Sequence, residues 1–268
     1  MSDKSNFKVK TDHHIAWLTL SRPEKRNTMG LAFFEEIGEL FDSFDRDPDI
    51  RVVVIKAEGK SFSAGTDLEE AAKLLGQGSA DGRESMRNKI LELQQGFTKI
   101  ERCRKPVIAA VHSHCIGGGV DMICACDIRM ATADAIFSIR ETRMGIIADL
   151  GTLQRLPHII GHGWFRELAL TGRDFTAQEA LQMGLVTRIC DDPSTLYEEA
   201  EKLASQIAAC PPLTVQGTKE TLIFNRDNGI EAGLYYVAQK NAAALPSEDL
   251  FEAVNAFMEK REPVFKGK

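Results

Sequence analysis

The sequence predicts an α/β protein in which pairs of strands alternate with helices, followed by a helical C-terminal region. Residues 52–55 and 106–111 are short, nearly continuous apolar runs, a pattern typical of strands covered on both faces of a sheet. Residues 31–46 have the apolar periodicity of an amphipathic helix. With 268 residues, the chain is expected to form a core over residues 1–194 and a helical region over residues 195–268.

The first hundred residues are expected to contain two strands, two helices and a loop. Residues 7–20 are rich in strand formers and predict two short strands that turn at Asp12 and His13. Residues 84–103 repeat apolar side chains at helical spacing. Residues 69–83 are predicted to be a loop because they contain three glycines. These glycines are Gly76, Gly78 and Gly82.

Short strands are expected at residues 126–132 and 136–139, and the last strand at residues 184–190. A capping box that begins at Thr176 predicts the start of a helix. After residue 194, apolar side chains recur on three predicted helices, and we expect these stripes to pack on the core or on a partner subunit. The stripes consist of Leu196, Ala200, Leu203 and Ile207, then Ile230, Leu234 and Val237, then Leu250, Val254 and Phe257.

Composition and charge argue against several classes of protein. The net charge is −6 without a basic tail or stripe, so no nucleic-acid partner is expected. No apolar run approaches the length needed to cross a bilayer, so no membrane association is expected. The six cysteines form no C-x-x-C pair and are expected to be reduced thiols. Without a targeting signal at either end, the expected location is cytoplasmic.

Common catalytic motifs are missing. His112 and His114 are separated by one residue, but a metal site needs further ligands at defined spacing, so no metal is expected. The sequence has no G-x-S-x-G motif and no G-x-G-x-x-G after a strand, which argues against a serine hydrolase and a dinucleotide-binding fold.

Two glycine-containing loops each follow a predicted buried strand. One covers residues 63–68, and the other covers residues 116–121 with the run Gly117-Gly118-Gly119. If the loops lie side by side, each can offer one backbone N–H to the same oxygen atom, which is the arrangement of an oxyanion hole. The alternative is a pair of tight turns that serve only close packing.

Three carboxylates stand close to the second loop in sequence, namely Asp121, Glu141 and Asp149. Carboxyl groups beside an oxyanion site can transfer protons. Alternatively, Asp121 is an early-helix residue favoured by the helix dipole and Asp149 caps the next segment. The cations Lys25 and Arg26 lie in a polar loop, where they are either solvated or in contact with ligand phosphates.

The chain resembles the crotonase (enoyl-CoA hydratase/isomerase) superfamily from about Phe7 to Lys260. The resemblance implies a spiral of ββα turns, a C-terminal helical region used for oligomerisation into a trimer or hexamer, and an acyl-CoA thioester substrate. It implies no cofactor, since CoA is part of the substrate. The segments that carry the resemblance are residues 22–27, 64–68, 117–119, 151–156, 171–173 and 184–186.

The resemblance also assigns residues to the substrate. It places the oxyanion hole on the backbone N–H groups of Thr66 and Gly118, and it makes the CoA phosphates the reason for Lys25 and Arg26. The acyl tail is expected against residues 70–100. Further substrate contacts are implied for Ala64, Gly65, Asp67, Leu68 and Gly117.

The acidic residues distinguish the subfamilies. Ordinary enoyl-CoA hydratases carry glutamate at the positions of Asp121 and Glu141 and glycine at the position of Asp149. All three acids of this chain instead match the dienoyl-CoA isomerases, which convert 3,5-dienoyl-CoA to 2,4-dienoyl-CoA in fatty acid β-oxidation. One departure is the sequence His112-Ser113-His114, where small residues are more usual and which could alter the floor of the pocket.

This resemblance implies that Glu141 removes the C2 proton, that Asp149 delivers a proton to C6, and that Asp121 supports them. The runner-up is an enoyl-CoA hydratase that positions water with Asp121 and Glu141. A third alternative, from another class, is a non-catalytic subunit that binds acyl-CoA.

Overall fold

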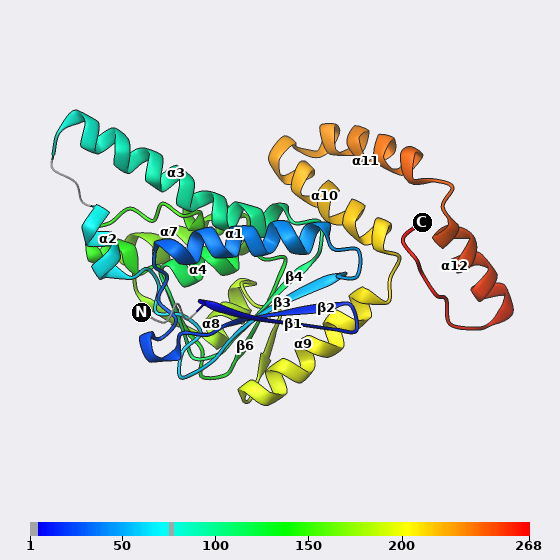
Figure 1. The fold of residues 1–268 in the computed structure, drawn as a ribbon, viewed down its shortest axis with the longest axis horizontal. Coiled ribbons are helices and arrows are strands. Elements are labelled where there is room, and N and C mark those ends of the chain that lie inside the picture. The colour runs from blue at the N-terminus through cyan, green and yellow to red at the C-terminus, as the bar shows by residue number, and fades with distance from the viewer. Residues whose placement is uncertain (1–4, 75–77) are drawn as a thin grey trace.

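The computed structural model describes residues 5–74 and 78–268, and its ribbon is shown in Figure 1. A six-stranded sheet has the order β1-β2-β3-β4-β6-β9, and a small sheet has the order β5-β7-β8. The strands are β1 (Phe7–Asp12), β2 (Ile15–Leu20), β3 (Val52–Ala57), β4 (Val107–Val111), β5 (His114–Ile116), β6 (Ile128–Thr132), β7 (Ile136–Ser138), β8 (Asp174–Thr176) and β9 (Arg188–Cys190).

Helices follow most of the strands, so the predicted alternation of strand pairs and helices is confirmed. The α-helices are α1 (Leu31–Arg46), α2 (Leu68–Leu74), α3 (Ala80–Arg102), α4 (Gly118–Cys124), α5 (Thr152–Arg155), α6 (Pro157–Ile160), α7 (His162–Thr171), α8 (Ala177–Met183), α9 (Pro193–Ala208), α10 (Pro212–Asn228), α11 (Ile230–Ala244) and α12 (Glu248–Glu259). Two 3₁₀ helices are η1 (Pro23–Lys25) and η2 (Arg140–Met144).

The large sheet is covered on both faces, as the apolar runs predict. From β2 to β9 its strands pair in parallel, and only β1 runs antiparallel. Because side chains alternate along a strand, Val53 and Ile55 of β3 enter the core beneath α1 and α3, while Val52 and Val54 enter a second core beneath α9. In Figure 1, α1 and α3 cross one side of the sheet and α9 the other.

The sheet order brings the two glycine loops together. Strand β3 pairs with β4, and the chain leaving β4 forms β5 almost at once. A single parallel bridge joins Ser63 to Cys115, and Ser63 N–H donates to the His114 carbonyl at 3.0 Å. The loop after β3 therefore lies against the strand that leads into the Gly117 turn, at the carboxyl ends of parallel strands, where α/β proteins commonly bind ligands.

Most of the predicted loop at residues 69–83 is helical where the structure describes it, and only residues 78 and 79 lie outside a helix. Helix α2 begins at Leu68 because Asp67 Oδ1 accepts hydrogen bonds from the N–H groups of Glu69 (3.1 Å) and Glu70 (3.3 Å). Helix α3 begins at Ala80, four residues earlier than expected, and Ser79 Oγ caps it by accepting from the Gly82 N–H at 3.0 Å. Gly76, the first glycine of the predicted loop, lies outside the described residues.

Most other expected elements are confirmed with shifted ends. The helix at 31–46 and the capping box at Thr176 are as predicted. The last strand is shorter than expected, β9 beginning only at Arg188. Its predicted start, Gly184, instead ends α8 in the left-handed conformation with φ of 82°.

The C-terminal region divides into one helix on the core and three that extend from it. Helix α9 buries Leu196, Ala200 and Ala204 against the large sheet. The division of the chain between residues 194 and 195 remains a prediction, and the contacts of α9 favour a core that runs through Ala208. Figure 1 shows α10, α11 and α12 to one side of the sheet.

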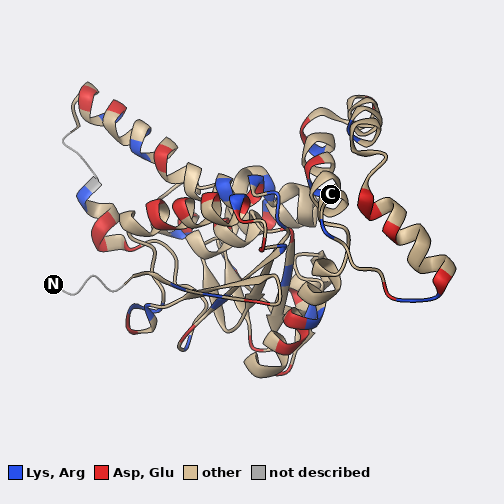
Figure 2. Cartoon of the chain, turned by 45° about the vertical axis from the view of Figure 1, so that its right-hand side comes forward, with Lys and Arg blue, Asp and Glu red and all other residues tan. Residues whose placement is uncertain are grey.

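Helices α11 and α12 expose apolar side chains, so their predicted stripes do not pack on the core of the same chain. Leu234 is 65% exposed and Phe257 82% exposed. Figure 2 shows Lys and Arg interspersed with Asp and Glu over the helices. Within residues 5–74 and 78–268, no helix is both long and apolar enough to cross a membrane.

Candidate active site

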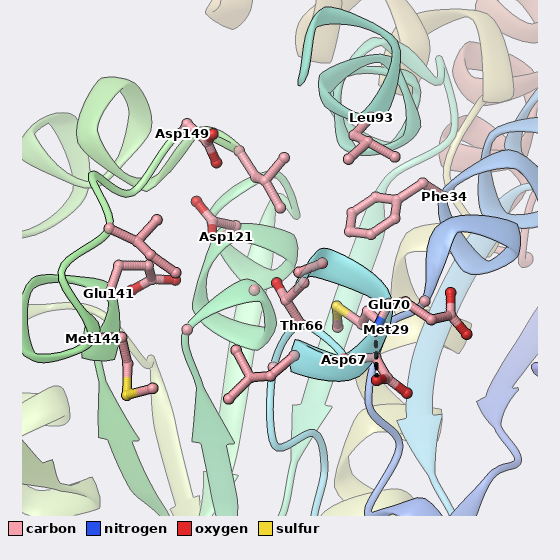
Figure 3. A pocket seen from close by; sticks show the side chains of 18 of the residues that line it. Met29, Phe34, Thr66, Asp67, Glu70, Leu93, Asp121, Glu141, Met144 and Asp149 are labelled. Carbon is pink, nitrogen blue, oxygen red and sulfur yellow. Dashed lines mark hydrogen bonds between the residues drawn. The ribbon is translucent and has the colours of Figure 1, made fainter. Parts of the chain in front are cut away.

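A cavity of about 380 Å³ lies where the loops after β3 and β5 meet helices α1, α2 and α3. Figure 3 shows Asp121, Glu141 and Asp149 on one side of this cavity and Phe34 and Leu93 on the other. Thr66 lies between the two groups in this view. The cavity thus combines an acidic wall, a central backbone loop and an apolar wall.

The two glycine loops approach each other through their backbones. Met29 N–H donates to the Gly65 carbonyl, and Asp67 N–H donates to the Met29 carbonyl, both at 2.9 Å, which holds Thr66 between them. Gly65 has φ of +90°, and a Cβ atom there would lie 2.7 Å from the Ile116 carbonyl oxygen and 3.4 Å from the Gly118 nitrogen. Only glycine fits this contact.

Thr66 and Gly118 line the same cavity. A Cβ atom at Gly118 would lie 3.5 Å from the Thr66 nitrogen, so the two groups are close neighbours. Within the described residues, neither N–H donates to a backbone carbonyl. Both residues line the cavity, and two free, adjacent N–H groups can hold one oxyanion.

Glu141 belongs to η2 and has a carboxylate oxygen without a hydrogen-bond partner. This oxygen, Oε2, is buried and unpaired among the described residues. Burial, together with the negative charge of Asp121, raises the pKa of Glu141 to about 7. A carboxyl group with this pKa can take up and release protons near neutral pH.

Asp121 in α4 is buried and already hydrogen-bonded. Its Oδ1 atom accepts the Thr152 N–H at 2.7 Å, and it is only 1% exposed. Burial raises the pKa of Asp121 to about 6, although the bonds from Thr152 oppose this shift. The bond fixes the start of α5, and thereby the end of the segment that carries Asp149.

Asp149 lies between η2 and α5, in a segment without regular secondary structure. Burial raises the pKa of its carboxyl group, which favours the protonated form. Its backbone carbonyl accepts a hydrogen bond of 2.7 Å from the side-chain amide of Gln94 in α3. Gln94 was missed in the sequence, although it directly follows Leu93, a member of the apolar stripe.

Arg140 is a second residue that the sequence did not single out. It lines the cavity next to Glu141, its guanidinium pairs with Asp174, and its Nε donates to Ser138 Oγ at 3.2 Å. These contacts hold η2 against β7 and β8. The signal available in the sequence was only its position beside the predicted base.

The apolar wall consists of side chains from α1 and α3. Phe34, Met86, Ile90 and Leu93 line it. Three of these four belong to the 70–100 region expected to contact an acyl tail. Phe34 comes from the amphipathic helix of residues 31–46 and was not assigned to the site.

The predicted substrate contacts divide into two groups. Lys25 and Arg26 are exposed in and beside η1, and Lys25 Nζ lies 3.6 Å from Asp67 Oδ2, at the edge of the site. Asp67 also caps α2, so its carboxylate is already engaged. The second group consists of predicted contacts that line the cavity itself: Ala64, Gly65, Asp67, Leu68 and Gly117.

Neither His112 nor His114 belongs to the described lining of the cavity. His112 Nε2 lies 3.0 Å from the Gly59 carbonyl oxygen, and its Nδ1 lies 3.3 Å from the Tyr197 hydroxyl. His114 is exposed. In the part of the chain that the structure describes, no group of three or more His, Cys, Asp or Glu could hold a metal ion.

Comparison with known proteins places this site in a family. The model of the family described as enoyl-CoA hydratase/isomerase matches residues 10–268. The chain belongs to the enoyl-CoA hydratase/isomerase family. Its α/β fold is that of the family, since the crystal structure of an enoyl-CoA hydratase from Bacillus anthracis matches 98% of this chain and 100% of its own with a TM-score of 0.90 and 32% identity.

Two curated members of the family are more similar in sequence. The mitochondrial Delta(3,5)-Delta(2,4)-dienoyl-CoA isomerase of Dictyostelium discoideum is 47% identical over 94% of this chain and 87% of its own length. The peroxisomal Delta(3,5)-Delta(2,4)-dienoyl-CoA isomerase of Arabidopsis thaliana is 46% identical over 95% of this chain and 94% of its own. Both are more similar to this chain than the hydratase structure is.

The same comparison corrects the expected location. A cytoplasmic location was inferred because neither end of the sequence carries a recognisable address. The two isomerases named above are mitochondrial and peroxisomal, so the cytoplasmic prediction is wrong.

Proposed function

We propose that this protein is an isomerase that converts 3,5-dienoyl-CoA to 2,4-dienoyl-CoA. The observation that carries the proposal is the placement of three carboxyl groups and two free backbone amides around one cavity with an apolar wall. The identities of 46–47% to dienoyl-CoA isomerases support the same reaction.

The reaction moves two double bonds towards the thioester. A proton leaves C2, the electrons shift along the chain, and a proton is added at C6. The intermediate is a dienolate whose negative charge resides largely on the thioester oxygen. The Thr66 and Gly118 amides would stabilise that oxygen, and losing one such donor typically costs about 10²–10³ in rate.

Glu141 is proposed as the base at C2. Its buried, unpaired carboxylate oxygen is ready to accept a proton, and its raised pKa makes it a stronger base than an exposed glutamate. The Gly117 turn lies next to its carboxylate, which brings the base close to the amide pair.

Asp149 is proposed as the acid at C6. One carboxylate cannot easily serve two carbons four bonds apart, so a second group is needed. The raised pKa of Asp149 favours the protonated state that this role requires. Asp121 is proposed as a supporting residue, because its negative charge raises the pKa of Glu141 and its hydrogen bond fixes Thr152.

The substrate is proposed to be an acyl-CoA thioester that lies across the cavity. Phe34, Ile90 and Leu93 would contact the acyl chain by apolar packing. Lys25 and Arg26, at the edge of the site, are proposed to contact the CoA phosphates. The reaction needs no further cofactor, since proton transfer and oxyanion stabilisation suffice.

A hydratase would need a different use of the same carboxylates. Asp121 would have to hold water together with Glu141, but its Oδ1 atom already binds the Thr152 N–H inside the protein. Asp149 would also lack a task. These two features favour isomerisation over hydration.

A homo-oligomer is proposed, a trimer or hexamer by resemblance to the family, and the exposed apolar residues of α11 and α12 support an oligomer. Exposed side chains as large as Leu234 and Phe257 on adjacent helices would be covered by another chain in such an oligomer. Light scattering coupled to size exclusion would give the mass, and a monomer at micromolar concentration would contradict the proposal.

The isomerase activity can be tested with a 3,5-dienoyl-CoA. The purified protein should generate the ultraviolet absorbance of the conjugated 2,4-dienoyl product. Glu141→Gln and Asp149→Asn should each lose most of this rate and still fold. Faster hydration of crotonyl-CoA would favour the hydratase, and binding of CoA esters without turnover would favour a non-catalytic subunit.

A further inference from the structure

The segment that carries Asp149 is attached to helix α3 at both of its ends. At one end, Gln94 Nε2 donates to the Asp149 carbonyl oxygen at 2.7 Å. At the other end, Arg155 Nη2 donates to Thr98 Oγ1 at 3.3 Å, and Arg155 Nε lies 3.2 Å from Glu101 Oε1. These three partners lie at positions i, i+4 and i+7 of one helix face.

Gln94 does not belong to the wall of the catalytic cavity. It lines a second cavity of about 300 Å³ behind Leu150 and Gly151, and it is absent from the described lining of the catalytic cavity. Its side-chain amide therefore contacts the backbone of Asp149 outside the described lining of the catalytic cavity. Its hydrogen bond to Asp149 is a contact through which it can act on the reaction without touching the substrate.

The same helix also contacts the proposed acyl site. Leu93, the residue before Gln94, and Ile90, one turn earlier, both line the catalytic cavity. Helix α3 thus has one face towards the acyl chain and an adjacent face towards the backbone of the acid. Its C-terminal half is firmly packed, with Phe97 and Ile100 fully buried.

From this geometry we propose that Gln94 is a positioning residue for Asp149, and that it holds the acid at the distal end of the acyl chain that α3 itself contacts. The inference rests on the isomerase function proposed above. Asp149 lies outside any helix or strand, so the loss of this hydrogen bond would let its backbone, and with it the carboxyl group, shift. A displacement of about 1 Å can reduce a rate by about 100-fold.

The test uses two glutamines that are neighbours on the same helix. Gln94→Met removes the donor and keeps a side chain of similar length. Gln95→Met makes the same chemical change at an exposed position and serves as the control. We expect Gln94→Met to reduce kcat at least about tenfold with little change in KM, and Gln95→Met to leave both parameters unchanged.

A second measurement separates positioning from general damage. In D₂O, Glu141 should still exchange the C2 protons of the bound substrate in Gln94→Met, even where delivery at C6 is slow. Retained exchange with lost isomerisation supports the inference. Equal loss of exchange and isomerisation overturns it, because the damage would then not be confined to Asp149.

The variant Gln94→Glu provides a pH-dependent rescue. A protonated carboxyl group can donate to the Asp149 carbonyl, whereas a carboxylate repels it. The activity of this variant relative to the parent protein should therefore rise as the pH falls. A ratio that stays constant with pH contradicts the inference.

The isomerase activity of the parent protein distinguishes failure of the inference from failure of the proposed function. A parent protein that does not isomerise 3,5-dienoyl-CoA overturns the proposed function, and the inference with it. An active parent protein together with an unimpaired Gln94→Met overturns the inference alone.

Discussion

The carboxylate of Glu141 occupies the space that a side chain at Gly117 would need. A Cβ atom at position 117 would lie 2.9 Å from Glu141 Oε1, closer than real Cβ contacts allow. Gly117 also has φ of +52° and ψ of −118°, which disfavours any other residue. This glycine therefore serves two purposes, since it shapes the turn before Gly118 and lets the proposed base approach the amide pair.

Gly117→Ala should reduce both activity and stability. The methyl group would displace the Glu141 carboxylate and strain the backbone, and strain of this kind costs about 1–3 kcal/mol. We expect a loss of kcat of at least about tenfold, measured by dienoyl-CoA isomerisation. The free energy of unfolding, from urea titration, should fall by the same amount, about 1–3 kcal/mol.

The control for this variant is Gly163→Ala in α7. Apart from its chain neighbours and the backbone of its own helix, no described atom lies within 4 Å of a Cβ at this position, and its φ is not positive. Alanine is favoured over glycine inside a helix by about 0.5–1 kcal/mol, so this variant should be equally or more stable and fully active. A fully active Gly117→Ala would show that Glu141 does not need its position beside the turn.

Replacing Glu141 should stabilise the protein at high pH. The pKa of Glu141 is raised in the folded state from 4.5 to about 7. A raised pKa means that the unfolded state ionises more readily, so stability declines as the pH increases from about 4.5 to 7. Glu141→Gln removes the buried charge and should gain about 3 kcal/mol at alkaline pH, with the gain vanishing below about pH 4.

Glu179→Gln is a control because it should change the pH dependence of stability in the opposite direction. The Glu179 carboxylate accepts the Thr176 N–H at 2.8 Å in the capping box, and this bond lowers the pKa of Glu179. Its substitution should therefore destabilise the protein at neutral pH and have little effect in acid. Thermal unfolding of both variants across pH measures these changes. A destabilising effect of Glu141→Gln at alkaline pH would contradict the argument.

Features that depend on local patterns could be predicted from the sequence. The buried strands β3 and β4 were visible because apolar runs such as residues 52–55 are rare outside covered sheets. The two glycine loops were visible because each follows such a strand. The acids at 121, 141 and 149 were found by their spacing from these loops, and they do face one cavity.

Features that depend on distant contacts could not be predicted in this way. Gln94 and Asp149 are 55 residues apart, and no local pattern indicates that an amide on one will meet a carbonyl on the other. Helix α2 was missed because its start depends on the cap by Asp67, and its glycine-rich surroundings indicated a loop. Arg140 was missed for the same reason, since its partner Asp174 lies 34 residues further along the chain.

Lys219→Met should detach helix α10 from the core. Lys219 is buried, and its Nζ lies 2.6 Å from Asp127 Oδ2 and donates to the Lys105 carbonyl oxygen at 3.0 Å. The same Asp127 oxygen accepts the Val107 N–H at the start of β4. Removing the ammonium group leaves the Lys105 carbonyl and the Asp127 carboxylate, whose side chain is 29% exposed, without this donor, which typically costs about 1–3 kcal/mol.

The double variant Lys219→Met/Asp127→Asn separates the cost of an unpaired Asp127 charge from the cost of losing the Lys219 side chain. It lacks both charges, so its stability should recover part of the loss seen in the single variant. Isomerase kcat at a temperature where the variants are folded should change little, because neither residue lines the described cavity. A large loss of kcat in the folded double variant would show that α10 also affects the site.

The length of acyl chain that the enzyme accepts should depend on Phe34. Its ring lies at the apolar wall of the cavity and packs against Phe97 with centroids 5.1 Å apart. Phe34→Leu would enlarge the cavity at this wall and keep the wall apolar. We expect kcat/KM to rise for longer dienoyl-CoA substrates relative to shorter ones, since each additional buried methylene contributes about 0.8 kcal/mol.

Phe44→Leu makes the same substitution on the same helix and serves as the reference. Phe44 is also buried, but it packs on Phe41, 5.6 Å away between centroids, and not on the described cavity. Both variants should lose comparable stability, because each leaves a small void in one continuous core. Only Phe34→Leu should alter the ratio of kcat/KM between long and short substrates, and an equal ratio in both variants would place the acyl chain elsewhere.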